Sequence, residues 1–123
     1  MIIDAHGHVF PRVRGRVAAG PTRGLGYGRM GIGDDVLQLM PPLNEHTEHT
    51  TSMLLANLDW AGVDRAVLLQ GTFYGQCDDY VAEAAGAHPD RLVGALWCDP
   101  WRSGFRAYFE QQVGSGGFRV GKI

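Results

Sequence analysis

The stretch Ala61-Gly62-Val63-Asp64-Arg65-Ala66-Val67-Leu68-Leu69-Gln70 predicts the end of a helix, a turn and a buried strand in direct succession. Gly62 follows an apolar helical pattern at the position that a C-cap glycine takes. The apolar run from Arg65 to Gln70 is too short for a helix between its turn signals, and it is typical of a strand buried on both faces. Such strands belong to parallel sheets covered by helices, so this stretch indicates an α/β fold.

Upstream of this stretch we expect one helix, one long loop and one strand. Residues 50–52 (Thr-Thr-Ser) are good N-cap types, and apolar residues at helical spacing follow them up to Ala61. Residues 1–5 have the pattern of a buried strand. Residues 11–45 are rich in Gly, Arg and Pro, which predicts a long loop with a helical turn near residues 35–39.

Downstream, the helix–strand succession recurs. Asp78 or Asp79 can cap a helix that ends at Pro89. Asp99 and Pro100 are the residue types of an N-cap and a first helical position, so they predict the start of a third helix. The two remaining apolar runs, at residues 91–97 and 117–123, are expected to be the third and fourth strands.

The order of these elements points to a known architecture. Strands recurring roughly every 25 residues have the period of βα units in a parallel sheet. Four parallel strands with three helices, and a long loop after strand one, look like the N-terminal half of a TIM-type (β/α)₈ barrel of about 250 residues. We expect residues 1–123 to be one incomplete domain whose open sheet edge favours a homo-oligomer.

Composition excludes several classes of protein. The net charge of -2 gives no global attraction to nucleic acid, and no apolar run approaches the ~20 residues of a membrane-spanning helix. No signal peptide is visible, and Cys77 and Cys98 are far apart without a C-x-x-C spacing. We expect a cytoplasmic protein with reduced thiols and no nucleic-acid or membrane partner.

The first strand leads into a motif that suits a metal. Residues 3–10 read Ile-Asp-Ala-His-Gly-His-Val-Phe. His6 and His8 are two residues apart, so on a strand their imidazoles point to the same side and make half of a divalent-metal site. Asp4 either accepts a hydrogen bond behind a ligand or caps the strand end. Catalytic zinc needs about three protein ligands, so the rest of the site lies elsewhere.

Other polar residues have two readings each. His46 and His49 form His-x-x-His beside Glu45 and Glu48; a solvated segment is favoured over a second metal cluster, although His49 can reach a substrate. Gln70, Tyr74 and Trp97 follow strand ends and can line a pocket, but core packing explains the two aromatics equally well.

The arginines of the long loop also leave alternatives open. Five of them, at positions 12, 14, 16, 23 and 29, have no acidic neighbour before Asp34. They form a solvated loop, or a bidentate clamp for a substrate carboxylate in which Arg12 is the first candidate, or, as the least favoured alternative, a contact to nucleic-acid phosphates. The segment Gly26–Gly31 matches G-x-G-x-x-G, but it neither follows a strand nor opens a clear helix, so a dinucleotide site is rejected.

Four segments together resemble a known family. They are IDAHGHVF (3–10), ANLDWAGVDRAVLLQ (56–70), DYVAEAAGAHPDRLVGALWCDP (79–100) and GFRVGKI (117–123). In this order they are similar to the N-terminal half of the amidohydrolase-related proteins, in the branch that contains aminocarboxymuconate-semialdehyde decarboxylase-like enzymes.

The resemblance implies a metal-dependent barrel enzyme with a divalent cation, most often Zn²⁺, on His6 and His8. Further histidines on strands five and six and an aspartate on strand eight complete the family's site, and this sequence ends before them. The implied activity is hydrolysis of a small carboxylate-bearing molecule by metal-activated water. The alternatives are decarboxylation of such a molecule, or a truncated, inactive chain that self-associates. No catalytic residue is assigned within the chain.

Overall fold

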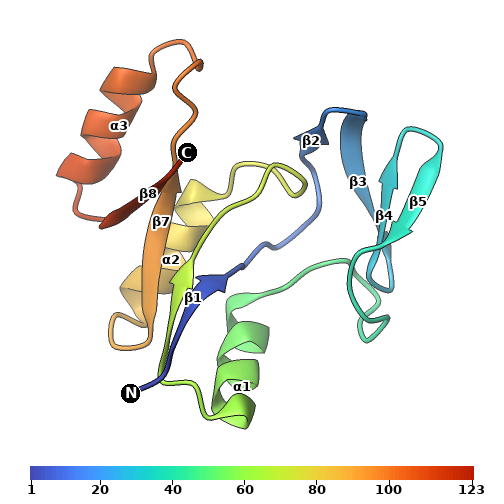
Figure 1. Ribbon diagram of the computed structural model, residues 1–123, viewed down its shortest axis with the longest axis horizontal. Helices are drawn as coiled ribbons and strands as arrows, with labels where there is room; N and C mark the ends of the chain where they lie inside the picture. The colour runs from blue at the N-terminus through green and yellow to red at the C-terminus, as the bar shows by residue number, and fades with distance from the viewer.

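The computed structural model describes all residues, 1–123, and its centre is a four-stranded parallel sheet. The strands lie in the order β1 (Ile3–Gly7), β6 (Arg65–Leu68), β7 (Leu92–Trp97) and β8 (Val120–Lys122), and each pair is parallel. Figure 1 shows these strands side by side, with β1 next to β6 and β8 next to β7. The four parallel strands expected from the sequence are confirmed.

Three helices accompany the sheet: α1 (Thr51–Ala61), α2 (Asp78–Ala87) and α3 (Phe105–Gly114). The predicted caps of the first helix are confirmed. The Thr50 hydroxyl accepts a hydrogen bond from the backbone N–H of Met53, and Gly62 ends the helix in the left-handed region at φ 68°.

The core lies on one face of the sheet, because successive side chains of a strand point to opposite faces. Ala66 and Leu68 of β6 are fully buried and belong to the main hydrophobic cluster. Val67 between them, and Val93 beside it on β7, are only half-buried. The helices supply Leu54, Leu58, Val81 and Ala84, and β7 supplies Leu92 and Leu96. The opposite face carries the half-buried Val67 and Val93 and the fully buried Ala95.

The first strand differs from its prediction. It spans Ile3–Gly7 rather than residues 1–5, and Ile3 is 54% exposed instead of buried. The physical reason is that β1 is an edge strand with a neighbour on one side only.

The expectation of a long loop at residues 11–45 with a helical turn near 35–39 is wrong. This segment forms a second, antiparallel sheet of β2 (Arg16–Val17), β3 (Gly20–Gly26), β4 (Arg29–Ile32) and β5 (Asp35–Gln38). Figure 1 shows it standing apart from the parallel sheet. The many glycines and arginines of this segment interrupt the apolar–polar alternation that identifies a strand. Residues 35–38 pair with β4 instead of forming the predicted helical turn.

The second sheet is attached through its own small core. Phe10, Val13, Met30 and Tyr74 form this cluster, and the rings of Phe10 and Tyr74 stack at 4.6 Å between centroids. The β3–β4 turn depends on glycine: Gly28 has φ 72°, and a Cβ there would lie 2.2 Å from the carbonyl oxygen of Met40. The segment after β1 is therefore an ordered subdomain with its own sheet and hydrophobic cluster.

Two predicted helix caps are also wrong. The N-cap residue of α2 is Cys77, without a side-chain bond, and the Asp78 carboxylate turns inward instead. Helix α3 begins at Phe105 after Gly104 rather than at Pro100. Asp99 accepts a hydrogen bond from the backbone N–H of Trp101 at 3.0 Å, which makes a local turn of the kind that aspartate favours. No helix of the structure is both long and apolar enough to cross a bilayer.

Candidate metal and substrate site

His6 and His8 lie together at the C-terminal end of β1. Gly7 pairs with Leu68, whose side chain is in the helix-covered core, so the flanking histidines face the opposite side of the sheet. Their ring centroids are 4.9 Å apart, with an interplanar angle of 63°. His6 is exposed and His8 is half-buried. Two imidazoles at this distance can bind the same metal ion.

The ring orientation of His8 is fixed by its neighbours. Its Nδ1 lies 2.9 Å from the carbonyl oxygen of Leu69 and 3.0 Å from the hydroxyl of Tyr74, and that hydroxyl donates to the same carbonyl. Because a carbonyl only accepts, Nδ1 carries the proton, and Nε2 keeps its lone pair. Burial lowers the pKa of His8 below its ordinary value, which favours the neutral imidazole that binds metals.

Two further residues hold the backbone of this motif. The Nδ1 atom of His49 lies 2.7 Å from the carbonyl oxygen of His8, and the backbones of His49 and Phe10 exchange two hydrogen bonds. Asp4 accepts a hydrogen bond from the backbone N–H of His6 at 2.9 Å, which is the strand-capping alternative. A pocket of about 310 Å³ is lined by both histidines of the motif together with His49.

The Lys122 side chain places a positive charge near the histidines. Lys122 on β8 donates from Nζ to the carbonyl oxygen of Gln70 at 2.7 Å, and its charge is one of the influences that lower the pKa of His8. The sheet therefore brings residues from the first and last strands to one end, as the carboxyl ends of parallel strands do.

Gln70 and Trp97 belong to a buried hydrogen-bond network rather than to the histidine pocket. The Gln70 side chain is buried; its amide donates to the Asp78 carboxylate at 2.5 Å and accepts from the backbone N–H of Cys77. Asp78 also accepts from the side chains of Gln76 and Tyr108, and from the backbone N–H of Trp97 at 3.4 Å. Sequence reasoning missed this role of Asp78, because an aspartate ahead of a helix looks like a cap.

Tyr74 and Tyr108 keep their phenolic protons. Burial raises the pKa of Tyr74 well above its usual range. Burial and the hydrogen bond to Asp78 raise the pKa of Tyr108 to about 12. Both hydroxyls are therefore fixed donors, one in the histidine site and the other in the Asp78 network.

The structure separates the five loop arginines. Arg23 and Arg29 donate to backbone carbonyls of the second sheet and brace its hairpins. Arg12 and Arg14 line a pocket of about 410 Å³ that also contains Tyr74, and their guanidinium groups have no hydrogen-bond or ion-pair partner in the chain. Arg16 is exposed on β2. A clamp of all five does not form.

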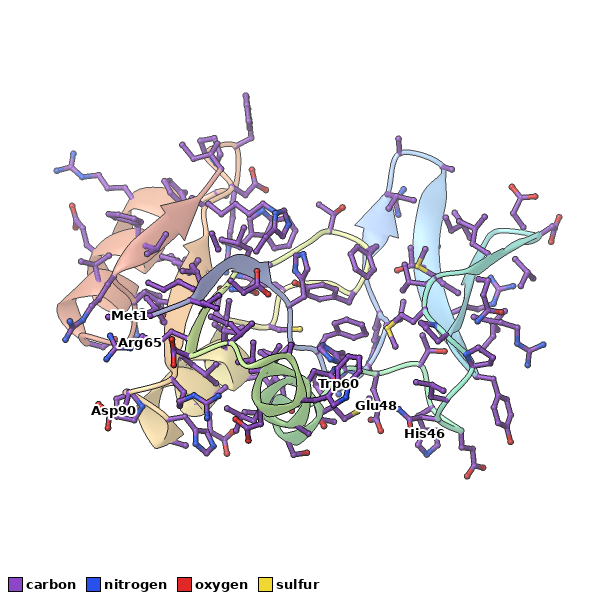
Figure 2. All side chains as sticks on the ribbon, turned by 60° about the horizontal axis from the view of Figure 1, so that its bottom comes forward. Met1, His46, Glu48, Trp60, Arg65 and Asp90 are labelled. Atoms are coloured by element: carbon purple, nitrogen blue, oxygen red, sulfur yellow. The ribbon has the colours of Figure 1, made fainter.

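No second metal cluster is present. Figure 2 shows His46 and Glu48 on the segment ahead of α1, with His46 at the outside of the molecule. Nowhere in residues 1–123 do three or more His, Cys, Asp or Glu side chains converge on one point as a metal requires. The Gly26–Gly31 motif spans the β3–β4 turn, without the strand-to-helix setting that a dinucleotide site needs.

The four parallel strands, the three helices and the histidines at the end of β1 define the class of protein. The chain has the fold of the first four strands of a (β/α) barrel. The chain belongs to the amidohydrolase family, whose family model, described as Amidohydrolase, matches residues 3–123. The branch that the sequence resembles is left undecided by this match.

A solved structure shows the same fold. A crystal structure of a probable 2-pyrone-4,6-dicarboxylic acid hydrolase from Acinetobacter baumannii, with citric acid bound, superposes with a TM-score of 0.54 at 19% identity. The match covers 99% of this chain and 37% of that protein, so the chain spans about a third of its length. The expected half-barrel fold is thereby confirmed. No curated protein matches the chain.

Proposed function

We propose that this amidohydrolase-family chain supplies the first two ligands of a divalent-cation site, in a hydrolase that acts on a small carboxylate-bearing molecule. The observation that carries the proposal is the hydrogen bonding of His8: Nδ1 is held by Leu69 and Tyr74, which leaves Nε2 available, and the His6 ring lies 4.9 Å away between centroids. Metal-binding histidines ordinarily have their other ring nitrogen held in this way.

The donor set fits a borderline-soft cation. Imidazole nitrogen suits Zn²⁺, and also Mn²⁺ and Fe²⁺, and no thiolate or carboxylate of this chain joins the pair. When bound, such a cation supplies Lewis acidity to substrate and water. His6 and His8 would hold it, while Tyr74 and Leu69 orient His8 and His49 fixes the His8 backbone.

The substrate class rests on Arg12 and Arg14. A guanidinium group binds a carboxylate through two parallel hydrogen bonds, and neither arginine has another partner in the chain. Tyr74 contributes to both the histidine site and the arginine pocket, so the two sites share a wall. Gln70 and Trp97 stabilise that wall through Asp78.

An inactive chain that self-associates is the second candidate, and one observation favours it. Two imidazoles are fewer than the three protein ligands of a catalytic zinc site, and no third ligand converges on them. In that case the chain binds a cation without turnover.

Zinc binding tests the metal site. Equilibrium dialysis against Zn²⁺ is expected to give at least tenfold weaker binding for the His6→Ala/His8→Ala variant than for the unchanged protein. His46→Ala is the matched control, since its imidazole lies away from the pair, and it is expected to leave zinc binding unchanged. Equal retention by the double variant and the unchanged protein contradicts the proposal.

A further inference from the structure

Three arginine side chains from two loops line one pocket of the molecule. The pocket has a volume of about 410 Å³, and its lining includes Arg12, Arg14 and Arg102. Arg12 and Arg14 follow β1, and Arg102 lies between β7 and α3. Both loops leave the parallel sheet at the C-terminal ends of its strands (Figure 1), where α/β folds bind their ligands.

The loop that carries Arg12 and Arg14 has a fixed backbone. Val13 between them is buried in the small core that attaches the second sheet. The backbone N–H of Arg14 donates to the carbonyl oxygen of Tyr74 at 3.2 Å, which ties this loop to the residue that holds His8. The two arginines are therefore anchored by their backbone, while their guanidinium groups have no partner in the chain.

Arg102 is held in place without a countercharge. Its guanidinium carbon lies 4.2 Å from the centroid of the Tyr108 ring, and one of its five N–H donors bonds the side-chain oxygen of Gln76 at 3.1 Å. None of the three ion pairs of the chain includes Arg102. Most of its donors are therefore available to a ligand.

The residues that hold Arg102 are themselves fixed by a buried acid. Asp78 is 4% exposed and accepts hydrogen bonds from the side chains of Gln70, Gln76 and Tyr108. All three donors are neutral, and Arg102 makes no ion pair with Asp78. Asp78 thus fixes Gln76 and Tyr108, and these two residues fix Arg102.

Arg91 shows how the chain uses an arginine that only stabilises the fold. Arg91 donates to the Asp59 carboxylate at 2.7 Å and to the carbonyl oxygens of Asp64 and Val63. Its hydrogen-bonding capacity is spent on the turn between α1 and β6. Arg102 differs, because stacking and a single hydrogen bond hold it beside a pocket that contains two further free guanidinium groups.

We propose that Arg102 is a substrate-binding residue: the anionic group of the substrate lies between Arg102 and the Arg12–Arg14 pair, and Tyr108 and Gln76 position Arg102 for it. This inference rests on the proposed function for the class of substrate, a carboxylate, and it adds the second loop and its buried support. A guanidinium group that is already stacked on a ring loses little freedom when it binds a carboxylate through two hydrogen bonds.

Titrations of the metal-free protein with benzoate and with benzamide, followed by NMR, test the pocket, because the two probes differ in charge and hardly in shape. Arg102→Gln is expected to weaken benzoate binding about tenfold, the cost of losing hydrogen bonds to a charged group, and to leave benzamide binding unchanged. Arg106→Gln is the matched control, since Arg106 is exposed on α3, pairs with Glu110 and lies outside the pocket. It is expected to bind benzoate as the unchanged protein does.

Two variants of Tyr108 test the positioning of Arg102. Tyr108→Phe keeps the ring beneath the guanidinium group and is expected to retain benzoate affinity within about twofold. Tyr108→Leu removes the ring and is expected to weaken benzoate binding about threefold, with no effect on benzamide. Equal benzoate affinity of the two variants overturns the positioning role of Tyr108.

The outcomes separate this inference from the proposed function. If Arg12→Gln/Arg14→Gln weakens benzoate binding and Arg102→Gln does not, the inference is overturned and the proposed function stands. If none of these variants weakens it, both the role of Arg102 and the carboxylate pocket of the proposed function are overturned. Equal losses for Arg102→Gln and Arg106→Gln show a response to net charge alone, which also overturns the inference.

Discussion

Removing the Tyr74 hydroxyl tests how the site holds His8. In the Tyr74→Phe variant, the Leu69 carbonyl keeps its hydrogen bond from His8, so no buried acceptor is left unpaired. The loss is therefore one ordinary hydrogen bond, about 1 kcal/mol in the free energy of unfolding. For a chain of this size the melting temperature falls by roughly 4 °C.

The effect on zinc is expected to exceed the effect on folding. His8 loses one of the two groups that fix its ring, and loss of a partner behind a metal ligand costs about tenfold in affinity, at the lower end of the usual range. That corresponds to about 1.4 kcal/mol of binding free energy. Competition titration with a chromophoric chelator measures it.

Tyr108→Phe is the matched control. Tyr108 donates to Asp78 in the buried network and has no contact with the histidines, so this variant loses stability but not zinc affinity. If Tyr74→Phe binds Zn²⁺ as tightly as the unchanged protein, or if both variants lose affinity equally, then Tyr74 does not position His8.

Four further predictions have defined outcomes. Asp78→Asn places amide protons against donors in a buried network, and chemical denaturation should show a loss of about 3 kcal/mol; a loss below 1 kcal/mol would argue against the network. Because the folded pKa of His8 lies below its ordinary value of 6.5, the unfolded metal-free chain takes up more protons as the pH falls through 6.5. The free energy of unfolding should therefore fall as the pH is lowered below 6.5, and it should fall less in a His8→Asn variant. Equal pH dependence of the unfolding free energy in the two proteins would refute this. Burial raises the pKa of the Cys98 thiol, so alkylation of Cys98 by iodoacetamide should be slow at pH 7, and fast labelling of the folded chain would contradict its burial. Gly28→Ala should destabilise the second sheet by at least 1 kcal/mol through its clash with Met40, with loss of protection from hydrogen exchange confined to β3–β5; full protection would disprove the clash.

The parallel half of the fold was accessible from sequence because its signals are local. Thr50 and Gly62 mark the ends of α1, and an apolar run such as Arg65–Gln70 has few alternatives to a buried strand. The recurrence of these units then fixes the topology, since βα units follow one another in a parallel sheet.

The second sheet was not accessible, because it depends on contacts rather than on pattern. Gly26 and Gly31 lie in paired strands, where glycine is disfavoured, but a Cβ would lie 2.5 Å from the carbonyl oxygen of Glu45 at the first position and 2.9 Å from the Arg23 guanidinium carbon at the second. Arg23 lies over Gly31, so an arginine fills the place of an apolar partner. No periodicity count detects such a pairing.

The candidate site was accessible only in part. The alternation of a strand is enough to place His6 and His8 on one side. The hydrogen-bond partners of His8 cannot be predicted in this way. Leu69 acts through its backbone, and Tyr74 follows it by five residues in a loop whose path only the structure shows. Asp78 was misplaced because an exposed cap and a buried acceptor have the same residue type.

The most direct measurement is a long-range ¹H–¹⁵N correlation spectrum of the imidazole groups, recorded on the ¹⁵N-labelled chain with and without Zn²⁺. The account predicts that the Nε2 resonances of His6 and His8 shift on zinc addition, while Nδ1 of His8 stays protonated. His46 and His88 should be unaffected. A shift at Nδ1 of His8, or a response from His46 and His88 without one from His6 and His8, would contradict it.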